Sequence, residues 1–296
     1  MPVSQINSEE KEKEQASENV YSETFVPRFR DADEDGLIGA KGYFNLFQDL
    51  TSAHMYCYGL GNDALPERTG CAWIFTKYKL HIFKKVNFNA PLKVETWVET
   101  VKSPLLVNHA LHISAAKGEF DPAELGKENG TGFQNLSADF ELVAEGRVET
   151  CPFHLKEQKL KRLSEIDFEK DISSPRVNEL PRFSRILRKE DGMEYRYTHK
   201  VTYTDLDRSE HMNNVKYIDL FLNAFSAEFH REHCISDMEL HFVNQCFEGE
   251  EIRVYSIPET VSTDGGNRAD METNSAIRLL ALKENGSAAA ACRLIF

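Results

Sequence analysis

The sequence predicts an α+β protein in which one helix-and-sheet unit occurs twice in tandem. Three observations favour this class: stretches that align with each other within the chain, apolar residues at helical spacing inside those stretches, and strand-like segments after them. A helix with an apolar stripe must bury it, and an antiparallel sheet provides the covering face. Two such layered units are therefore expected.

The internal repeat consists of three matches that occur in the same order in both halves of the chain. The shift between the copies shrinks slowly, which indicates one duplicated unit with shorter loops in the second copy. The matches are residues 28–53 on 202–227 at a shift of 174, residues 79–96 on 239–256 at a shift of 160, and KENG at 127–130 on 283–286 at a shift of 156.

Each unit is expected to open with an extended segment, VPRFR or KVTYT, followed by an acidic loop and a helix. Before the first of these, residues 1–22 are polar and acidic and predict a mobile tail, with neither a signal peptide nor a transit peptide. The helices are indicated by apolar side chains at helical spacing. These are Tyr43, Phe44, Phe47 and Leu50 in the first unit and Tyr217, Ile218, Phe221 and Phe225 in the second.

Strands are expected after the first helix, where segments rich in β-branched and aromatic residues alternate with turn-forming stretches. They are KLHIFKKV (79–86), LKVETWVETV (92–101), LLVNHALHISAA (105–116) and NLSADFELVA (135–144). Charged runs and prolines in residues 151–193 suggest a linker that crosses the surface. The expected organisation is a tail (1–22), a first domain (23–150), this linker and a second domain (194–296).

The composition limits the partners of the chain. A formal net charge of −13 over 296 residues repels nucleic acid and anionic membranes unless a local basic patch overrides it. No apolar run approaches the roughly 18 residues of a membrane span, so membrane insertion is not expected. Six scattered cysteines without a CxxC pair are typical of a reducing compartment, so a cytoplasmic location is expected.

The two copies differ most in the loop before the helix. The second copy reads TDLDRSEHMNN, a density of acidic, basic and amide groups that a turn alone does not need. Asp205 and Asp207 have counterparts in Asp31 and Asp33, whereas His211 aligns with Leu37. We expect Asp205 to be structural, as a turn or cap residue, and the second copy to hold a functional site that the first copy lacks.

This loop, DLDRSEHMNNVKY, resembles the pattern Asp-x-Asn-x-His-x-Asn-Asn-x-x-Tyr of the acyl-acyl carrier protein thioesterases. A second stretch, LHFVNQCFEGEEI, resembles the strand of that family that carries a Glu-Cys pair. The resemblance covers nearly all of the chain after the tail. It implies two tandem hot-dog domains, each a long helix wrapped by a curved antiparallel β-sheet, and hydrolysis of acyl-acyl carrier protein to a free fatty acid.

Carried over by position, the resemblance implies that Asp207 and His211 are the catalytic aspartate and histidine and that Cys246 is the family's cysteine. Two positions depart from the pattern. Ser209 stands in place of the catalytic asparagine, and Gln245 in place of the glutamate that many members have before the cysteine. Glutamine cannot accept a proton and serine has a shorter reach than an amide, so we expect both to orient other groups by hydrogen bonding.

Thioester hydrolysis needs an activated water or nucleophile, donors for the developing oxyanion and an acyl pocket. Asp207 and His211 are four residues apart, close enough in a bent loop to share a water, and histidine is the better base near neutral pH. Asn213 or Asn214 could cap the following helix. The free N–H groups near Asn213 to Val215 would then hold the oxyanion.

A covalent route through Cys246 is the alternative mechanism. A cysteine next to His211 attacks a thioester only if the pKa of its thiol is lowered, and Ser209 replaces the amide of a Cys-His-Asn arrangement. Cys246 is also interpretable as a small buried residue on a strand, which is the interpretation favoured here.

Three other motifs are interpreted as structural, and no metal or cofactor is expected. EFHREHC (228–234) has no matching ligand pair elsewhere, so it is interpreted as a solvated helix end. His109 and His112 alternate along a strand and should face opposite ways. GLGNDALPERTG lacks the strand–loop–helix context of a phosphate loop and is interpreted as a connecting loop.

The resemblance also implies two surfaces. Acyl carrier protein is acidic, so a local basic face is required, and its candidates are KEQKLKRL (156–163), RFSRILRK (182–189), Lys77, Lys79, Lys84 and Lys85. In the family the acyl chain lies in a tunnel of the first unit. Candidate lining residues, for which core packing is the more ordinary interpretation, are Trp73, Phe75, Trp97 and Phe140.

The expected activity is therefore that of an acyl-[acyl-carrier-protein] hydrolase that terminates fatty acid synthesis. The alternatives are an acyl-CoA thioesterase of the same fold and a non-catalytic acyl-binding hot-dog protein, the second favoured by Ser209 and Gln245. The sequence does not indicate the acyl chain length, the choice between carrier protein and CoA, or whether two chains pair as a homodimer.

Overall fold

The computed structural model describes residues 19–117, 139–168, 172–260 and 275–296. The chain forms two compact units, Met1–Phe75 with Phe83–Pro181 and Thr76–Ile82 with Arg182–Phe296. Residues 1–18 of the predicted tail and the first KENG copy lie outside the described residues, and the described part begins just before a strand at Val20.

The first unit is a helix on an antiparallel sheet, as the spacing predicted. Its strands lie in the order β1-β3-β4-β5-β2, and the paired registers of β1 to β3, β3 to β4 and β4 to β5 are antiparallel. The elements are β1 (Val20–Phe25), η1 (Phe29–Asp31), α2 (Ala40–Cys57), α3 (Leu65–Thr69), β2 (Cys71–Ile82), β3 (Leu92–Val98), β4 (Val107–Ala116), β5 (Phe140–His154), β6 (Lys159–Leu160) and η2 (Leu163–Glu165).

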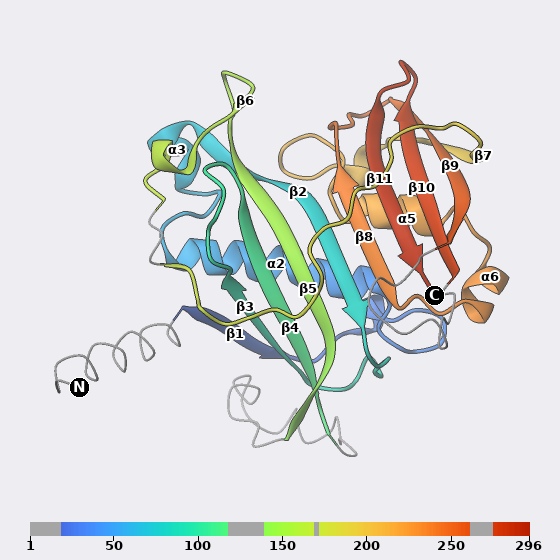
Figure 1. Ribbon diagram of the computed structural model, residues 1–296, viewed down its shortest axis with the longest axis horizontal. Helices are drawn as coiled ribbons and strands as arrows, with labels where there is room; N and C mark the ends of the chain where they lie inside the picture. Colours follow the sequence, from blue (N-terminus) through green and yellow to red (C-terminus); the bar gives the residue numbers. More distant parts are fainter. Residues whose placement is uncertain (1–18, 118–138, 169–171, 261–274) are drawn as a thin grey trace. The chain divides into compact units, whose positions relative to one another are not determined.

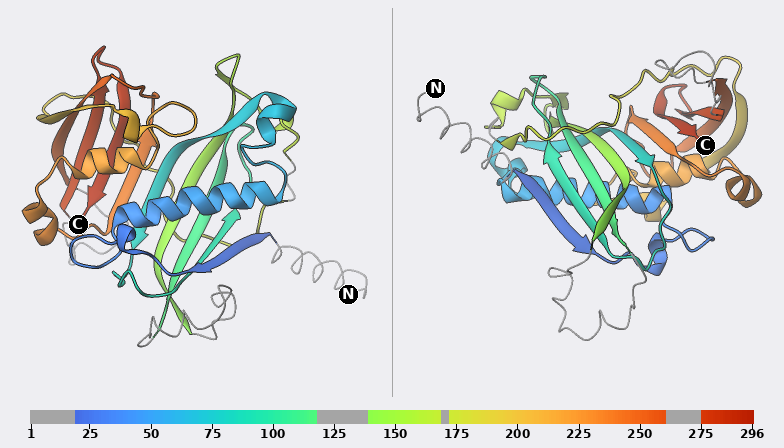
Figure 2. Two further views of the ribbon diagram at one scale, coloured as in Figure 1. Left: turned by 180° about the vertical axis from the view of Figure 1, so that it is seen from behind. Right: turned by 60° about the horizontal axis from the view of Figure 1, so that its bottom comes forward.

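Helix α2 lies along one face of this sheet (Figures 1 and 2). Its predicted apolar stripe is buried, with Phe44 and Phe47 wholly inaccessible. Gly146 of β5 lies directly beneath this stripe, because a Cβ at that position would come within 2.1 Å of the Phe47 ring. A glycine here lets the helix approach the sheet closely.

The second unit repeats this arrangement with a shorter helix. Its strands lie in the order β2-β8-β11-β10-β9-β7, and α5 covers one face of the sheet (Figures 1 and 2). The elements are β7 (Glu194–Lys200), η4 (Tyr203–Asp205), α5 (Lys216–Leu222), α6 (Ala227–Glu232), β8 (Asp237–Phe242), β9 (Glu251–Thr260), β10 (Ser275–Lys283) and β11 (Ala288–Ile295). Strand β2 contributes its last seven residues, 76–82, to this unit. The predicted α+β class is confirmed.

Helix α5 ends earlier than the apolar pattern suggested. Phe225 lies beyond its end at Leu222, in a turn that leads to α6. Ser226 starts α6 by accepting a hydrogen bond from the Phe229 N–H at 3.2 Å. A serine that accepts such a bond favours a new helix start over continuation of the previous helix.

Residues 151–193 are more closely packed than a surface linker. Strand β5 runs to His154, and Ile166, Phe168 and Ile172 join an apolar cluster of the first unit. Ile186 is 4% exposed in a cluster of the second unit. The charged runs suggested a solvated segment, but the apolar residues interspersed among them anchor it.

Candidate functional site

Both units carry the same turn between the short 3-10 helix and the main helix. In the second unit the Asp207 N–H donates to the His211 carbonyl at 3.0 Å, and the Glu210 N–H donates to the Asp207 carbonyl at 3.1 Å. Residues 33–37 of the first unit form the same two bonds at 2.9 and 3.0 Å. The repeat at a shift of 174 is therefore a structural repeat.

Glu210 holds this turn in the left-handed region with φ of +63°, where the first unit has Gly36 at +75°. Side chains other than glycine are uncommon there, and the conformation costs about 1 kcal/mol or more. The second unit therefore keeps the turn, although Glu210 is less suited to this backbone conformation than a glycine.

The turn is anchored to the segment that follows β8. The Met212 N–H donates to the Cys246 carbonyl at 2.7 Å, and in the first unit the Ile38 N–H donates to the Val86 carbonyl at 2.9 Å. Positions 86 and 246 are related by the second predicted shift, 160. This hydrogen bond brings together the two stretches that carried the family resemblance.

Asp205 acts as a cap, as expected. One oxygen of its carboxylate accepts hydrogen bonds from the Thr202 N–H at 2.9 Å, the Thr202 hydroxyl at 3.1 Å and His199 Nε2 at 2.9 Å. Burial opposes ionisation, but these hydrogen bonds hold the pKa of the Asp205 carboxyl below its ordinary value. Asp205 is thus committed to the scaffold and is not available for chemistry.

Asp207 and His211 face each other across the turn. Asp207 Oδ2 lies 3.7 Å from His211 Nδ1, and the side chains are 24% and 19% exposed. The other Asp207 oxygen accepts the Ser209 N–H at 2.7 Å. The carboxylate is therefore fixed by the loop backbone and one of its oxygens is directed at the imidazole.

The surroundings of His211 indicate its tautomer. Its Nδ1 lies 3.4 Å from the Met212 carbonyl as well as facing Asp207, and both neighbours are hydrogen-bond acceptors. A ring nitrogen between acceptors carries the proton, so the lone pair of the neutral ring is on Nε2. This is the nitrogen that can take a proton from water.

The backbone at the start of α5 is largely committed to internal hydrogen bonds. The Asn213 N–H donates to the Asp205 carbonyl at 2.8 Å, and the Val215 N–H donates to Asn213 Oδ1 at 2.9 Å. Within the described part of the chain, the Asn214 N–H has no acceptor. Among the three residues predicted to supply oxyanion donors, Asn214 is therefore the one whose backbone N–H is still available to bind an oxyanion.

Cys246 is wholly buried beside Tyr217. Burial raises the pKa of its thiol, although a hydrogen bond with the Tyr217 hydroxyl and the charge of Lys283 act in the opposite direction. Its neighbour Gln245 is exposed, and the Gln245 carbonyl accepts a hydrogen bond from Lys283 Nζ at 3.0 Å. From the sequence, Tyr217 was assigned only to the helix core, and Lys283 was not assigned to the site. Tyr217 could have been found, because it is the final tyrosine of the resembled pattern.

The remaining sequence motifs fall in structural roles. His230 Nε2 and His233 Nδ1 each contact a backbone carbonyl, at 2.9 and 3.0 Å, and no group of three metal-ligating residues occurs among the described residues. His109 faces α2, whereas His112 contacts Arg176 on the other face of β4. The stretch interpreted as a connecting loop contains the short helix α3.

Comparison with known proteins follows the same division of the chain. Residues 18–120 match the family model described as the acyl-ACP thioesterase N-terminal domain, and residues 188–295 match the acyl-ACP thioesterase C-terminal domain. The comparison with curated protein sequences gives no match.

Solved structures of acyl-ACP thioesterases share the fold. One from Bacteroides thetaiotaomicron is 17% identical, with a TM-score of 0.72 over 95% of this chain and 99% of that chain. The 12:0-ACP thioesterase from Umbellularia californica is 15% identical, with a TM-score of 0.69 over 94% of this chain and 93% of that chain. The expected tandem hot-dog fold is confirmed.

Proposed function

Because this chain belongs to the acyl-ACP thioesterase family, which hydrolyses acyl-ACP to release a free fatty acid, we propose that the reaction occurs at the loop before α5, where Asp207 and His211 activate a water. The observation that carries this proposal is the environment of His211. Two acceptors hold the proton on Nδ1, so Nε2 is the base.

In the proposed reaction a water attacks the thioester carbonyl carbon and gives its proton to His211 Nε2. The Asp207 carboxylate, 3.7 Å from Nδ1, stabilises the imidazolium that forms. The tetrahedral intermediate then expels the carrier's sulfur, which takes the proton from His211. The products are a carboxylic acid and a free thiol, and general acid–base catalysis of this kind supplies about 10²- to 10⁴-fold.

The oxyanion of the intermediate is assigned to the Asn214 N–H, since the N–H groups of Asn213 and Val215 have internal acceptors. Asn213 then holds the backbone in place through its side-chain amide. A preorganised donor of this type contributes on the order of 10²-fold.

Ser209 and Gln245 are given orienting roles. The Ser209 N–H fixes the Asp207 carboxylate at 2.7 Å, a contact that does not depend on the side chain at this position. Gln245 is exposed next to the anchored Cys246 and is proposed to orient substrate by hydrogen bonding. The replacement of the family's asparagine and glutamate is thereby tolerated.

Cys246 is proposed to anchor the loop and not to act as the nucleophile. Its thiol is buried and its raised pKa keeps it protonated near neutral pH. Its contribution is the carbonyl that accepts the Met212 N–H, a role that alanine can also fulfil.

The test is release of free thiol from acyl-ACP substrates of short to long chain length. His211→Ala and Asp207→Asn are expected to lower kcat by about 10²-fold or more. Asp33→Asn, the matched change in the same turn of the first unit, should retain activity. Cys246→Ala should retain kcat within about threefold. If this variant were completely inactive and an acyl-enzyme could be trapped in wild type, the covalent mechanism would apply instead.

We also propose a cytoplasmic location, supported by six cysteines that are all free thiols. Among the helices of the described segments, none is long and apolar enough to cross a membrane.

A further inference from the structure

The basic strap, residues 182–189 with the sequence RFSRILRK, carries four cations without an acidic side chain. Arg182, Arg185, Arg188 and Lys189 are all exposed. In the described part of the chain, no carboxylate lies within 4.0 Å of any of their charged groups. This stretch is basic in a chain whose formal net charge is −13.

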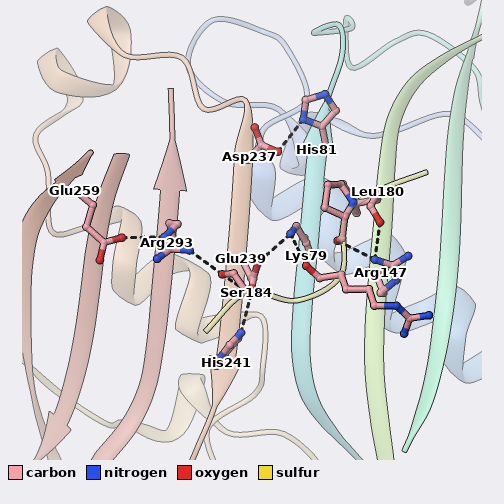
Figure 3. A network of polar contacts seen from close by, with 12 residues as sticks. Lys79, His81, Arg147, Leu180, Ser184, Asp237, Glu239, His241, Glu259 and Arg293 are labelled. Atoms are coloured by element: carbon pink, nitrogen blue, oxygen red, sulfur yellow. Dashed lines mark hydrogen bonds and ion pairs between the residues drawn. The ribbon is translucent and has the colours of Figure 1, made fainter. Parts of the chain in front are cut away.

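The strap is held firmly to the sheet at its middle. The Ser184 N–H and hydroxyl both donate to Glu239 Oε1, at 2.7 and 3.1 Å, and Arg293 Nη1 donates to the Ser184 hydroxyl oxygen at 2.7 Å. Figure 3 shows Ser184 between these two charged residues. The strap crosses the face of the sheet opposite α5 (Figure 1).

Two further contacts fix the rest of the strap. Ile186 is buried in a cluster with Leu280 and Leu282, and Arg278 Nη1 donates to the carbonyls of Leu187 and Lys189 at 3.1 and 3.2 Å. All of these contacts use the strap backbone or inward side chains. Its cationic side chains are therefore displayed on a fixed frame.

The acidic residue beneath the strap does not neutralise it. Glu239 pairs with Lys79 Nζ at 3.1 Å and His241 Nε2 at 2.8 Å (Figure 3). Burial of Glu239 opposes its ionisation, but these two partners hold the pKa of its carboxyl below the ordinary value. Its charge is already engaged by groups on β2 and β8.

The strap borders a groove of about 620 Å³, which residues 183–189 line together with Lys77 and His241. Lys77 Nζ lies 5.2 Å from the centre of the Phe183 ring, and Leu187 is 51% exposed. Cations interspersed with exposed apolar side chains suit a protein partner, because such a partner offers carboxylates and apolar contacts together.

Several of the other basic candidates from the sequence already pair with a carboxylate. Lys159 and Lys161 pair with Glu157 at 2.5 and 3.2 Å, and Lys84 pairs with Glu141 at 2.8 Å. Exposed cations that already have a carboxylate partner attract a second acidic surface weakly. The cations of the basic strap are therefore more available to an acidic partner than Lys84, Lys159 and Lys161.

The groove also lies close to the proposed site within the same unit. His241 lines the groove, and Cys246, five residues further along the chain, accepts the Met212 N–H of the catalytic loop. Five residues of chain span at most about 18 Å. Because the strap crosses the sheet face opposite α5, the thioester arm of a carrier seated on the groove would reach the loop past the end of β8.

We propose that the basic strap and its groove are the docking surface for the acidic carrier protein that delivers the acyl thioester. The inference rests on the proposed function, since it assigns the partner of that site. Charge complementarity of this kind steers association and raises its rate by about 10- to 10³-fold at low salt. Hydrolysis of carrier-bound substrates should therefore depend on the strap, whereas hydrolysis of carrier-free thioesters should not.

The test compares Arg185→Glu/Arg188→Glu with the matched variant Lys156→Glu/Lys159→Glu on the β5–β6 hairpin. Each enzyme is assayed with acyl-ACP and with the neutral N-acetylcysteamine thioester of the same acyl group. The ratio of the two kcat/KM values should fall at least about tenfold in the strap variant and stay near wild type in the matched variant. A ratio that is unchanged, or lost equally in both variants, overturns the proposal.

A binding measurement separates this proposal from the proposed function. The Kd of fluorescently labelled acyl-ACP for each variant is measured by anisotropy at low and high salt. Weaker and less salt-dependent binding to the strap variant supports docking even if no hydrolysis is detected in wild type. Wild-type affinity in the strap variant overturns docking even if hydrolysis is confirmed.

Discussion

Two buried histidines should make the first unit sensitive to acid. His54 of α2 is 2% exposed and His109 of β4 is inaccessible, and their ring centres are 6.2 Å apart. Neither ring has a hydrogen-bond partner for either nitrogen among the residues that the structure describes. Burial lowers the pKa of His54 from 6.5 to about 4, and burial with the charge of His54 lowers that of His109 to about 3.

Whether acid raises or lowers stability depends on whether the unfolded or the folded chain binds more protons. In the unfolded chain both imidazoles protonate as the pH falls below the ordinary 6.5, whereas in the folded chain both stay neutral down to about 4 and 3. Stability is therefore lost as the pH falls from 6.5 toward the folded values. At pH 5, which is 1.5 pH units below 6.5, each histidine costs about 2 kcal/mol, and the two together about 4 kcal/mol.

The assay is urea unfolding of the full chain at pH 7.5 and pH 5, for wild type and for His54→Leu/His109→Leu. Leucine fills a similar volume and cannot titrate, so the loss of unfolding free energy between the two pH values should shrink by about 4 kcal/mol. An equal loss of unfolding free energy in both proteins would show that His54 and His109 are not its cause. If the double variant does not fold, an NMR titration of wild type decides, because imidazole signals of His54 and His109 that protonate above pH 5.5 would show the same.

Three further predictions concern the frame of the site and its surroundings. Gly146→Ala should lower the unfolding free energy by about 1 to 3 kcal/mol, because its Cβ would meet the buried Phe47 ring at 2.1 Å, and an unchanged urea midpoint would show that the helix can shift. Asp205→Asn should cost about 1 to 2 kcal/mol at pH 7, since the bonds from Thr202 lose a charged acceptor. The lowered pKa of Asp205 places the loss of its contribution below its ordinary 3.8, so the cost should shrink only when the pH falls below that value. Iodoacetamide at pH 8 should modify the exposed Cys57 and Cys234 rapidly and Cys246 slowly by peptide mass analysis, and rapid labelling of Cys246 would contradict the raised pKa of its thiol.

The parts of the fold that repeat in the sequence could be predicted from it. The turn at residues 205–212 follows from the match at a shift of 174, because the backbones of Asp205 and Asp207 make the same local hydrogen bonds as those of Asp31 and Asp33. Local patterns of this kind are visible in a sequence because their partners are close in the chain.

Other features depend on partners that the sequence does not reveal. Residues 151–193 were assigned by their charges, although Ile166 and Ile186 find apolar clusters in different units. The donors at Asn213 and Val215 were expected to be free, yet their acceptors come from the turn itself and from the Asn213 side chain. Long-range packing and the direction of single hydrogen bonds are decided by tertiary context.

The difference between the two copies can be traced to one side chain at the start of the main helix. In the first unit a Cβ at Gly39 would lie 2.0 Å from an Asp33 carboxylate oxygen, so the carboxylate occupies the space above the start of α2. The equivalent position in the second unit is Asn213, whose side chain turns to the Val215 N–H. With a side chain at this position, the aspartate of the second unit faces His211 instead.

Asn213→Gly should therefore let Asp207 turn over the start of α5 and away from His211, because a carboxylate is attracted to free helix N–H groups. Asn213→Ala is the matched control, since it removes the amide but keeps the Cβ. Both variants lose the hydrogen bond to the Val215 N–H, so only the glycine variant tests the orientation of Asp207. The glycine variant should have a kcat for acyl-ACP about tenfold below that of the alanine variant, because small misplacements of a catalytic group are costly. Equal kcat values in the two variants would mean that Asp207 is held by the Ser209 N–H alone, and the asymmetry of the copies would then rest on His211.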